Sequence, residues 1–222
     1  MSDTKAQVRV IAVADLMFSG GVAARLDREA DGYPFHRISG VLRQADIVFG
    51  NLETPLTDSG KSGFVRGLPR FAAPRVFAQR LAQSGFSVAS LANNHILDQG
   101  YKGLMDTSSA LKEVGVRTVG IISNLRQQQG PAILERKGIK VGFLAYAASC
   151  LATSTSPGAV PIEVDRIFQE VADLQTTVEH ICISLHQGME YAPRPSYRGY
   201  RLIRRLLEAG ISVVLGHHPH VP

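Results

Sequence analysis

Short apolar runs that end in polar residues alternate with amphipathic stretches along most of the chain. Runs of about four to eight β-branched and apolar residues are typical of buried strands, whereas apolar residues at every third or fourth position indicate helices. We therefore expect strands over residues 8–13, 46–49, 86–91, 116–122, 180–185 and 211–215. Helices are expected over residues 75–83, 103–114, 163–178 and 195–209, with two short ones within residues 25–45. Alternation of strands and helices predicts an α/β fold with parallel strands.

Three segments depart from this alternation. Residues 132–135 and 139–146 read as a β-hairpin, which predicts a second, partly antiparallel sheet. Residues 54–74 are rich in Gly, Pro, Ser and Lys and are expected to form a long surface loop. Residues 148–161 are expected to form a loop of small residues.

Polar side chains with ligand chemistry follow five of the predicted strands. They are Asp15, Asn51 with Glu53, Asn94 with His95, His186, and His218 with His220. Ligands bind at the carboxyl ends of strands in open α/β sheets, so parallel neighbours would bring these side chains together. Taken singly, each has an ordinary explanation as a turn residue, a helix cap or a solvated loop histidine. Five such strand ends in one chain favour a shared site.

The candidate ligands are carboxylates, carboxamides and imidazoles, without a thiolate. That set suits Mn, Fe, Zn or Mg better than a soft metal. It also exceeds the four ligands of a structural zinc site. We therefore expect two divalent metal ions, a pair that supports in-line phosphoryl displacement when the ions lie about 3.5–4 Å apart.

The composition is that of an ordinary globular protein of 222 residues, with 45% hydrophobic and 19% charged residues. The net charge of +5 is modest, and an anionic substrate is compatible with it. The one dense basic cluster comprises Arg194, Arg198, Arg201, Arg204 and Arg205. It reads either as a solvated helix face or as a surface that binds a polyanion. A basic stripe with interleaved aromatic residues does not occur, so no nucleic-acid partner is expected.

Two cysteines, Cys150 and Cys182, define no disulfide framework, and neither is expected to be a catalytic thiol. Residues 1–7 are polar and lack the apolar segment of a secretory signal. No membrane segment is expected in this chain. As written, the sequence predicts a cytoplasmic protein, or an extracytoplasmic one if a leader has been removed.

The segments ADLMFSGG, FGNLETPL, LANNHILDQG, HQGMEY and GHHPHV, in this order, resemble the CapA family of poly-γ-glutamate capsule proteins. That family belongs to the calcineurin-like metallophosphoesterase superfamily. The resemblance implies a four-layer α/β/β/α sandwich, with two mixed sheets flanked by helices and a dinuclear metal site at the strand ends. It makes residues 1–222 a single CapA-like domain that is expected to lack the family's C-terminal strands.

The same resemblance implies roles for individual residues. It implies metal ligands at Asp15 and His220 for the first metal, and at Asn94, His186 and His218 for the second. His95 matches the histidine that contacts the phosphoryl group and protonates the leaving oxygen, so His95 and Asp15 are the expected catalytic residues. His217 is an additional histidine expected to support the ligands.

Two positions depart from the superfamily's motifs. Met17 stands where the Asp-x-His histidine would be, and Asn51 replaces the bridging aspartate, as is also the case in the CapA family. Glu53 is the expected replacement carboxylate, because residues two apart on an extended strand point to the same side. We therefore expect Asn51 and Glu53 to join the metal ligands. Glu190 reads either as a second acid or substrate contact, or as a helix-start carboxylate.

These observations favour a metal-dependent hydrolase of the phosphoesterase type, acting on an anionic small molecule or polymer. The alternative is a non-catalytic component of poly-γ-glutamate (capsule) synthesis or export that binds the polyanion. A third interpretation is an α/β domain that binds no metal.

Overall fold

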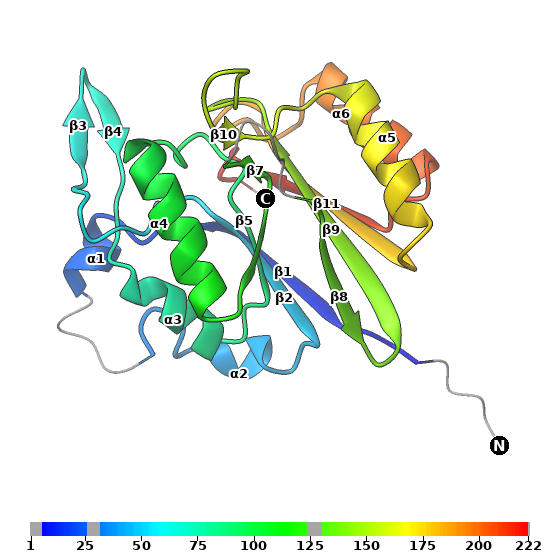
Figure 1. The fold of residues 1–222 in the computed structure, drawn as a ribbon, viewed down its shortest axis with the longest axis horizontal. Coiled ribbons are helices and arrows are strands. Elements are labelled where there is room, and N and C mark those ends of the chain that lie inside the picture. The colour runs from blue at the N-terminus through cyan, green and yellow to red at the C-terminus, as the bar shows by residue number, and fades with distance from the viewer. Residues whose placement is uncertain (1–5, 26–31, 124–129, 222) are drawn as a thin grey trace.

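The computed structural model describes residues 6–25, 32–123 and 130–221, and two four-stranded sheets form its centre (Figure 1). The first sheet has the order β1 (Val10–Leu16), β2 (Ile47–Leu52), β5 (Val88–Ser90), β6 (Arg117–Val119). Each neighbouring pair in this sheet is parallel. This differs from the expectation of two mixed sheets.

The second sheet is mixed. Its order is β12 (Val213–His217), β11 (His180–His186), β9 (Ile139–Ala147), β8 (Ala132–Arg136). Strands β12, β11 and β9 are parallel, whereas β8 and β9 form an antiparallel hairpin. The predicted hairpin and the second, partly antiparallel sheet are therefore confirmed.

Helices cover the outer faces of both sheets. Helices α3 (Val76–Gln83) and α4 (Gly100–Glu113) lie on the side of the first sheet, and α5 (Val164–Gln175) and α6 (Tyr197–Glu208) lie on the second (Figure 1). Phe49 of β2 stacks on Phe143 of β9 with ring centroids 5.7 Å apart, which joins the inner faces of the two sheets. The layers are α/β/β/α, so the expected fold class is confirmed.

The prediction of a loop over residues 54–74 is wrong in part. This segment contains a hairpin formed by β3 (Gly63–Val65) and β4 (Leu68–Arg70). The hairpin projects beside α4 (Figure 1). Arg66 and Gly67 at its tip both have left-handed φ angles, 51° and 80°, as a tight hairpin turn requires. The apolar residues of the hairpin are exposed, so no alternation of buried and polar positions marked it as strand.

The strand predicted over residues 116–122 is interrupted at Gly120, which has a φ of +88°. Beyond it, β7 (Ile121–Ile122) pairs with β10 (Gly158–Ala159), which lies in the predicted small-residue loop. A Cβ at Gly120 would lie 2.6 Å from the Ala92 Cβ and 2.8 Å from the Ala145 Cβ. Glycine is therefore required where the chain leaves the first sheet.

Two short helices occur near the N-terminus. Helix α1 (Gly21–Arg25) was not predicted, and α2 (Ser39–Leu42) lies within the predicted helical region over residues 25–45. Residues 26–31 of that region lie outside the described residues.

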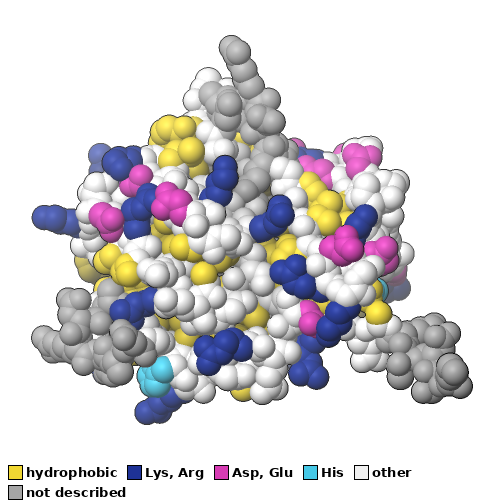
Figure 2. All heavy atoms as spheres, turned by 60° about the horizontal axis from the view of Figure 1, so that its bottom comes forward, with side chains coloured by type: hydrophobic (Ala, Val, Ile, Leu, Met, Phe, Trp, Pro, Cys, Tyr) yellow, Lys and Arg dark blue, Asp and Glu magenta, His cyan; other side chains and the backbone are white. Residues whose placement is uncertain are grey.

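The surface at the amino ends of the strands carries interspersed charges. Figure 2 shows this face, where Lys and Arg side chains alternate with Asp and Glu and with apolar side chains. On this face the positive excess is not gathered into one patch. Among the described residues, no helix has both the length and the apolar character needed to cross a bilayer.

Candidate metal centre

The carboxyl ends of strands from both sheets meet in one cluster of polar side chains. We call it the strand-end cluster, and it comprises Asp15, Asn51, Glu53, Asn94, His186, His217, His218 and His220. Strand register accounts for much of it, because Asp15 pairs with Asn51 in the first sheet and His186 with His217 in the second. All seven residues predicted as ligands lie at this edge of the molecule.

His186 connects the two sheets. Its Nε2 lies 2.8 Å from Asn94 Oδ1, and its Nδ1 lies 3.2 Å from Asn51 Nδ2. An amide nitrogen can only donate, so Nδ1 accepts and Nε2 carries the proton. Burial lowers the pKa of His186 to about 3. The ring is therefore neutral, which is the form that binds metals.

Asp15 contacts groups from both sheets. Its Oδ1 accepts a hydrogen bond from Asn51 Nδ2 at 2.7 Å, and its Oδ2 accepts one from the His218 backbone N–H at 3.1 Å. Oδ1 also lies 3.3 Å from His217 Nδ1, and Oδ2 lies 3.2 Å from His220 Nδ1. Burial alone would raise the pKa of Asp15, but His217 and these hydrogen bonds hold it well below its usual range. Asp15 is a permanent anion in this site.

Glu53 is the least compensated group in the cluster. It is 1% exposed, and among the described residues neither carboxylate oxygen has a hydrogen-bond partner. Its Oε1 lies 3.5 Å from His186 Nε2. Burial, followed by the charge of Asp15, raises the pKa of Glu53 to about 8. A buried carboxylate without a partner is costly, so the site is suited to an added cation.

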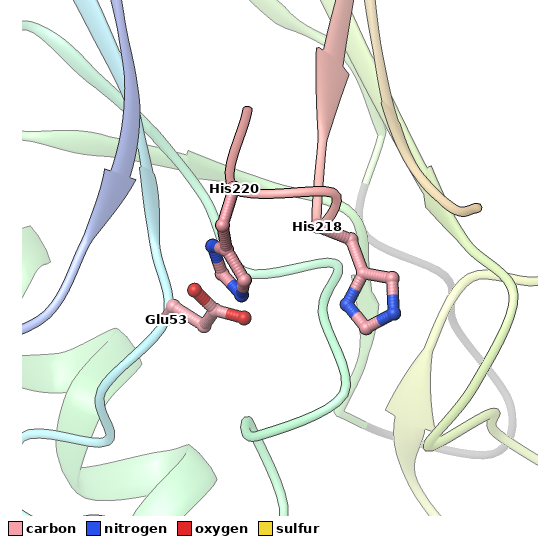
Figure 3. Close-up of side chains that lie close together, drawn as sticks. All are labelled: Glu53, His218 and His220. Carbon is pink, nitrogen blue, oxygen red and sulfur yellow. The ribbon is translucent and has the colours of Figure 1, made fainter. Parts of the chain in front are cut away.

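Two groups of donor atoms have spacings that fit a cation. Asp15, Glu53 and His186 form one group, and Glu53, His218 and His220 form the other, with the donor atoms of each within 4.8 Å of one another. Figure 3 shows the second group: the Glu53 carboxylate lies beside the His220 ring, and His218 comes from the same turn after β12. Glu53 belongs to both groups. Carboxylate and imidazole donors suit divalent Mn, Fe, Zn or Mg.

The family resemblance implies Asp15 and His220 as ligands of the first metal, and His186 and His218 as ligands of the second. Both pairs are neighbours in the structure, because His220 Nδ1 lies 3.2 Å from Asp15 Oδ2 and the His186 and His218 rings lie 4.9 Å apart. The turn itself is unusual, because His218 and His220 have left-handed φ angles of 91° and 56°. Non-glycine residues in this region are uncommon and concentrate at functional sites. His218 Nδ1 is also buried without a hydrogen-bond partner in the described structure.

A chain of carboxamides supports the ligands, and one member of it was not predicted. Asn93 Nδ2 donates to Asn51 Oδ1 at 3.3 Å and to the Leu52 carbonyl at 2.8 Å. Asn93 Oδ1 in turn accepts the His95 backbone N–H at 3.1 Å. The only sequence signal was the Asn-Asn-His run, in which the first asparagine had no assigned role. Asn93 is fully buried and positions Asn51.

His95 lies beside the cluster and outside both donor groups. Its Nδ1 is 2.9 Å from Asp98 Oδ2, and the same oxygen accepts the Phe71 backbone N–H at 2.7 Å. The Phe71 ring lies 4.4 Å from the His95 ring. Asp98 was also missed in the sequence, although its position three residues after His95 is a contact distance in a turn or helix. Together these contacts fix the orientation of the imidazole.

The remaining candidates lie around this centre. Met17 accepts a hydrogen bond from Thr54 Oγ1 at 2.8 Å through its sulfur. Glu190 is exposed, and its charge contributes to the raised pKa of Glu53. Cys182 is a buried core residue, and Cys150 donates its S–H to the Asn94 carbonyl. Burial raises the pKa of both thiols, which keeps them protonated.

Comparisons with known proteins agree with this fold. The family described as "Bacterial capsule synthesis protein PGA_cap" matches residues 9–222. The chain is 29% identical over 219 residues to the capsule biosynthesis protein CapA of Bacillus anthracis, covering 94% of this chain and 53% of that protein. It is 29% identical over 201 residues to a probable polyglutamine synthesis accessory protein of Mycobacterium tuberculosis, covering 80% of this chain and 50% of the relative. The chain thus spans about half the length of these relatives.

Solved structures show the same fold at low sequence identity. A novel phosphatase from Mycoplasma pneumoniae superposes with a TM-score of 0.57 at 14% identity, covering 97% of this chain and 65% of that one. A hypothetical protein from Thermus thermophilus superposes with a TM-score of 0.54 at 19% identity, covering 96% and 69% of the two chains.

Proposed function

The chain belongs to the bacterial capsule synthesis protein family PGA_cap, and from that membership we propose that it is a metal-dependent hydrolase of the phosphoesterase type. The observation that carries the proposal is the strand-end cluster. In it, Glu53 lies buried without a hydrogen-bond partner among the described residues and between two groups of histidine and carboxylate donors. We take residues 1–222 as one domain with this activity, and an anionic ester as its substrate.

In this proposal two divalent ions are held by Asp15, Asn51, Glu53, Asn94, His186, His218 and His220. Glu53 contributes to both positions because it belongs to both donor groups. Such ions supply a nucleophile at neutral pH and offset the negative charge that develops on a phosphoryl group. Asp15 fixes the geometry of the donors through its contacts with His217, the His218 backbone and His220.

As the imidazolium, with a proton on each ring nitrogen, His95 would donate its Nε2 proton to the leaving oxygen. Asp98 holds Nδ1 of the ring, so Nε2 is the atom available to a substrate. The Phe71 ring packs against the imidazole and limits its rotation. A histidine oriented by a carboxylate on one nitrogen and open at the other is a common arrangement for proton transfer.

The test measures metal content and phosphatase activity together. Purified protein is analysed for Mn, Fe, Zn and Mg, and its turnover of p-nitrophenyl phosphate is measured with added Mn²⁺. We expect Asn94→Ala and His218→Ala to lower turnover by about a hundredfold or more. His180→Ala is the matched control, because this exposed histidine lies at the opposite end of β11 and contacts Ser212. Unchanged turnover in both cluster variants would refute the hydrolase proposal.

A second candidate function is a non-catalytic component of poly-γ-glutamate synthesis or export. It is favoured by Met17, a poor ligand for hard cations, at the position of a superfamily histidine. Relatives of this chain are named as capsule biosynthesis and polyglutamine synthesis accessory proteins, which also favours this candidate. Retention of the protein on immobilised poly-γ-glutamate, with no hydrolysis of any ester in a substrate panel, would favour this candidate over the first.

A further inference from the structure

The β3–β4 hairpin projects from the fold and carries exposed apolar side chains (Figure 1). Phe64 is 77% exposed, Leu68 70% and Val65 47%, and we call these three residues the apolar patch. A Cβ at Gly67, at the tip, would have no atom within 4 Å, so the tip lies clear of the rest of the molecule. A single exposed apolar residue is ordinary, but a contiguous group of them marks an interaction surface.

Hydrogen bonds hold the base of the hairpin. Gln99, the residue before α4, donates from Nε2 to the Lys61 carbonyl at 3.1 Å and to the Phe71 carbonyl at 2.9 Å. The Ser62 hydroxyl accepts the Ala72 N–H at 3.0 Å and donates to the Ala72 carbonyl at 2.9 Å. These contacts lie on both sides of the hairpin. The folded chain therefore presents the apolar patch to solvent in a fixed position.

Apolar side chains occupy both faces of the hairpin. Phe64 pairs with Pro69, and Val65 pairs with Leu68, at adjacent positions of the antiparallel ladder. Because adjacent positions on a strand point to opposite faces, one pair lies on each face. A rigid protein partner would cover one of these faces and leave the other in water. The headgroup layer of a membrane surrounds an inserted projection and covers both faces.

Three basic residues accompany the apolar patch: Lys61, Arg66 and Arg70. Residues 59–74 contain no acidic residue, and among the described residues none of the three has a carboxylate within ion-pair distance. Long basic side chains place their charge among lipid phosphates while their apolar stems lie along buried surface. Each basic residue near an anionic membrane surface increases affinity by about fivefold. The charge of the hairpin thus complements anionic headgroups.

We propose that the apolar patch of the hairpin inserts among the headgroups of an anionic lipid membrane, while the three basic residues bind the lipid phosphates. The contact lies at the surface of the membrane, and no segment of the chain crosses the bilayer in it. The inference is independent of the proposed function, because this contact requires neither a metal ion nor hydrolysis.

The test measures co-sedimentation of the full chain, in EDTA, with vesicles of equimolar phosphatidylglycerol and phosphatidylcholine. We expect binding to be about a hundredfold tighter than to phosphatidylcholine alone and to weaken as salt is added. The double variant Phe64→Ser, Leu68→Ser should bind the anionic vesicles at least about tenfold more weakly.

The matched control is the double variant Tyr197→Ser, Leu207→Ser, which removes one aromatic residue and one leucine from exposed positions on α6. Its binding should stay within about twofold of that of the unmodified protein. Equal binding to the neutral vesicles, equal binding by the hairpin variant, or equal weakening by the control would overturn the proposal. Binding to neither kind of vesicle would also overturn it.

A fluorescence measurement locates the inserted segment. The chain contains no tryptophan, so Phe64→Trp introduces a single one on the hairpin. We expect its emission to shift to shorter wavelength on anionic vesicles and to be quenched by brominated lipid, because tryptophan then lies at the membrane interface. Tyr197→Trp, at a position that is also 77% exposed, should show neither change. Unchanged emission of Phe64→Trp in vesicle-bound protein would show that another surface binds the lipid, which would overturn the proposal.

Discussion

Burial of the Glu53 carboxylate in the strand-end cluster has a free-energy cost that no hydrogen bond from the described residues offsets. Its two oxygens lack hydrogen-bond partners among the described residues, and the permanently charged Asp15 lies in the same donor group. Burial and this charge raise the pKa of Glu53 to about 8, whereas an unfolded glutamate has a pKa near 4.5. In the metal-free protein the neutral carboxyl is therefore favoured up to mildly alkaline pH. A bound cation would reverse this preference.

The first prediction concerns stability and Glu53. A raised folded-state pKa contributes stability that is fully present below about pH 4.5 and is lost as pH rises through about 8. Glu53→Gln removes the ionisable group and keeps the shape. We therefore expect this variant to exceed the unmodified protein in free energy of unfolding by about 1–3 kcal/mol at pH 9 in EDTA, and by little at pH 5. Denaturant unfolding at both pH values measures this difference.

The same substitution should weaken metal binding, because a carboxamide is a poorer ligand than a carboxylate. Glu135→Gln, at an exposed position on β8, is the control and should change neither property. If the difference in free energy of unfolding between Glu53→Gln and the unmodified protein were the same at both pH values, Glu53 would be compensated by groups outside the cluster.

At this scale the ligand types were predictable but their partners were not. Asp15, His186 and His218 were identified because each follows an apolar strand, which is a local pattern. The roles of Asn93 and Asp98 depend on hydrogen bonds to Asn51, Leu52, Phe71 and His95, which come together only in the folded chain. A single sequence contains no record of those distances.

Among the elements, the short connection between β6 and β7 combines two local constraints at one residue, Gly120. Gly120 has a positive φ, and its Cα faces Ala92 after β5 and Ala145 of β9, so both sheets approach it closely. A side chain here would meet two obstacles, a strained backbone and a filled space.

The second prediction separates these two costs. We expect Gly120→Ala to lower the free energy of unfolding by about 2–4 kcal/mol, because it adds overpacking to backbone strain. Gly138→Ala, in the β8–β9 turn, has a similar φ of +78° but nothing within 4 Å of its Cβ. It should cost only about 1 kcal/mol. Equal losses in the two variants would show that packing between the sheets at Gly120 is unimportant.

The elements that the sequence predicted are those that bury one face or both. Strand β2 is buried along its whole length, and α3 buries Phe77, Ala78 and Leu81 on one side. The hairpin β3–β4 was missed because its side chains are exposed and its pairing is set by a tight turn. The break at Gly120 was missed because it depends on how closely the two sheets approach each other. The spacing of hydrophobic residues along the sequence does not indicate that distance.

At the scale of the whole molecule, the candidate ligands link the two sheets. Asp15 and Glu53 come from the end of the first sheet, whereas His186, His218 and His220 come from the second. The sheets otherwise meet through apolar packing such as that of Phe49 on Phe143. A cation held by both sets of ligands would therefore join halves of the fold that lie far apart along the chain. Binding to the folded state alone stabilises that state in proportion to the logarithm of the free ligand concentration.

The third prediction follows from this linkage. We expect Mn²⁺ at about a hundred times its dissociation constant to add about 3 kcal/mol to the free energy of unfolding and to raise Tm by several degrees, in a single transition. EDTA should reverse the shift. His218→Ala should abolish most of it, because it removes a donor of the second group, whereas His180→Ala, outside the cluster, should retain it. Thermal unfolding followed by circular dichroism, with and without metal, measures all four cases. A Tm that does not respond to Mn²⁺, Zn²⁺ or Mg²⁺ would mean that the ligands of the two sheets do not share a cation. An ion bound to both sheets stabilises the folded state, so its binding must raise Tm.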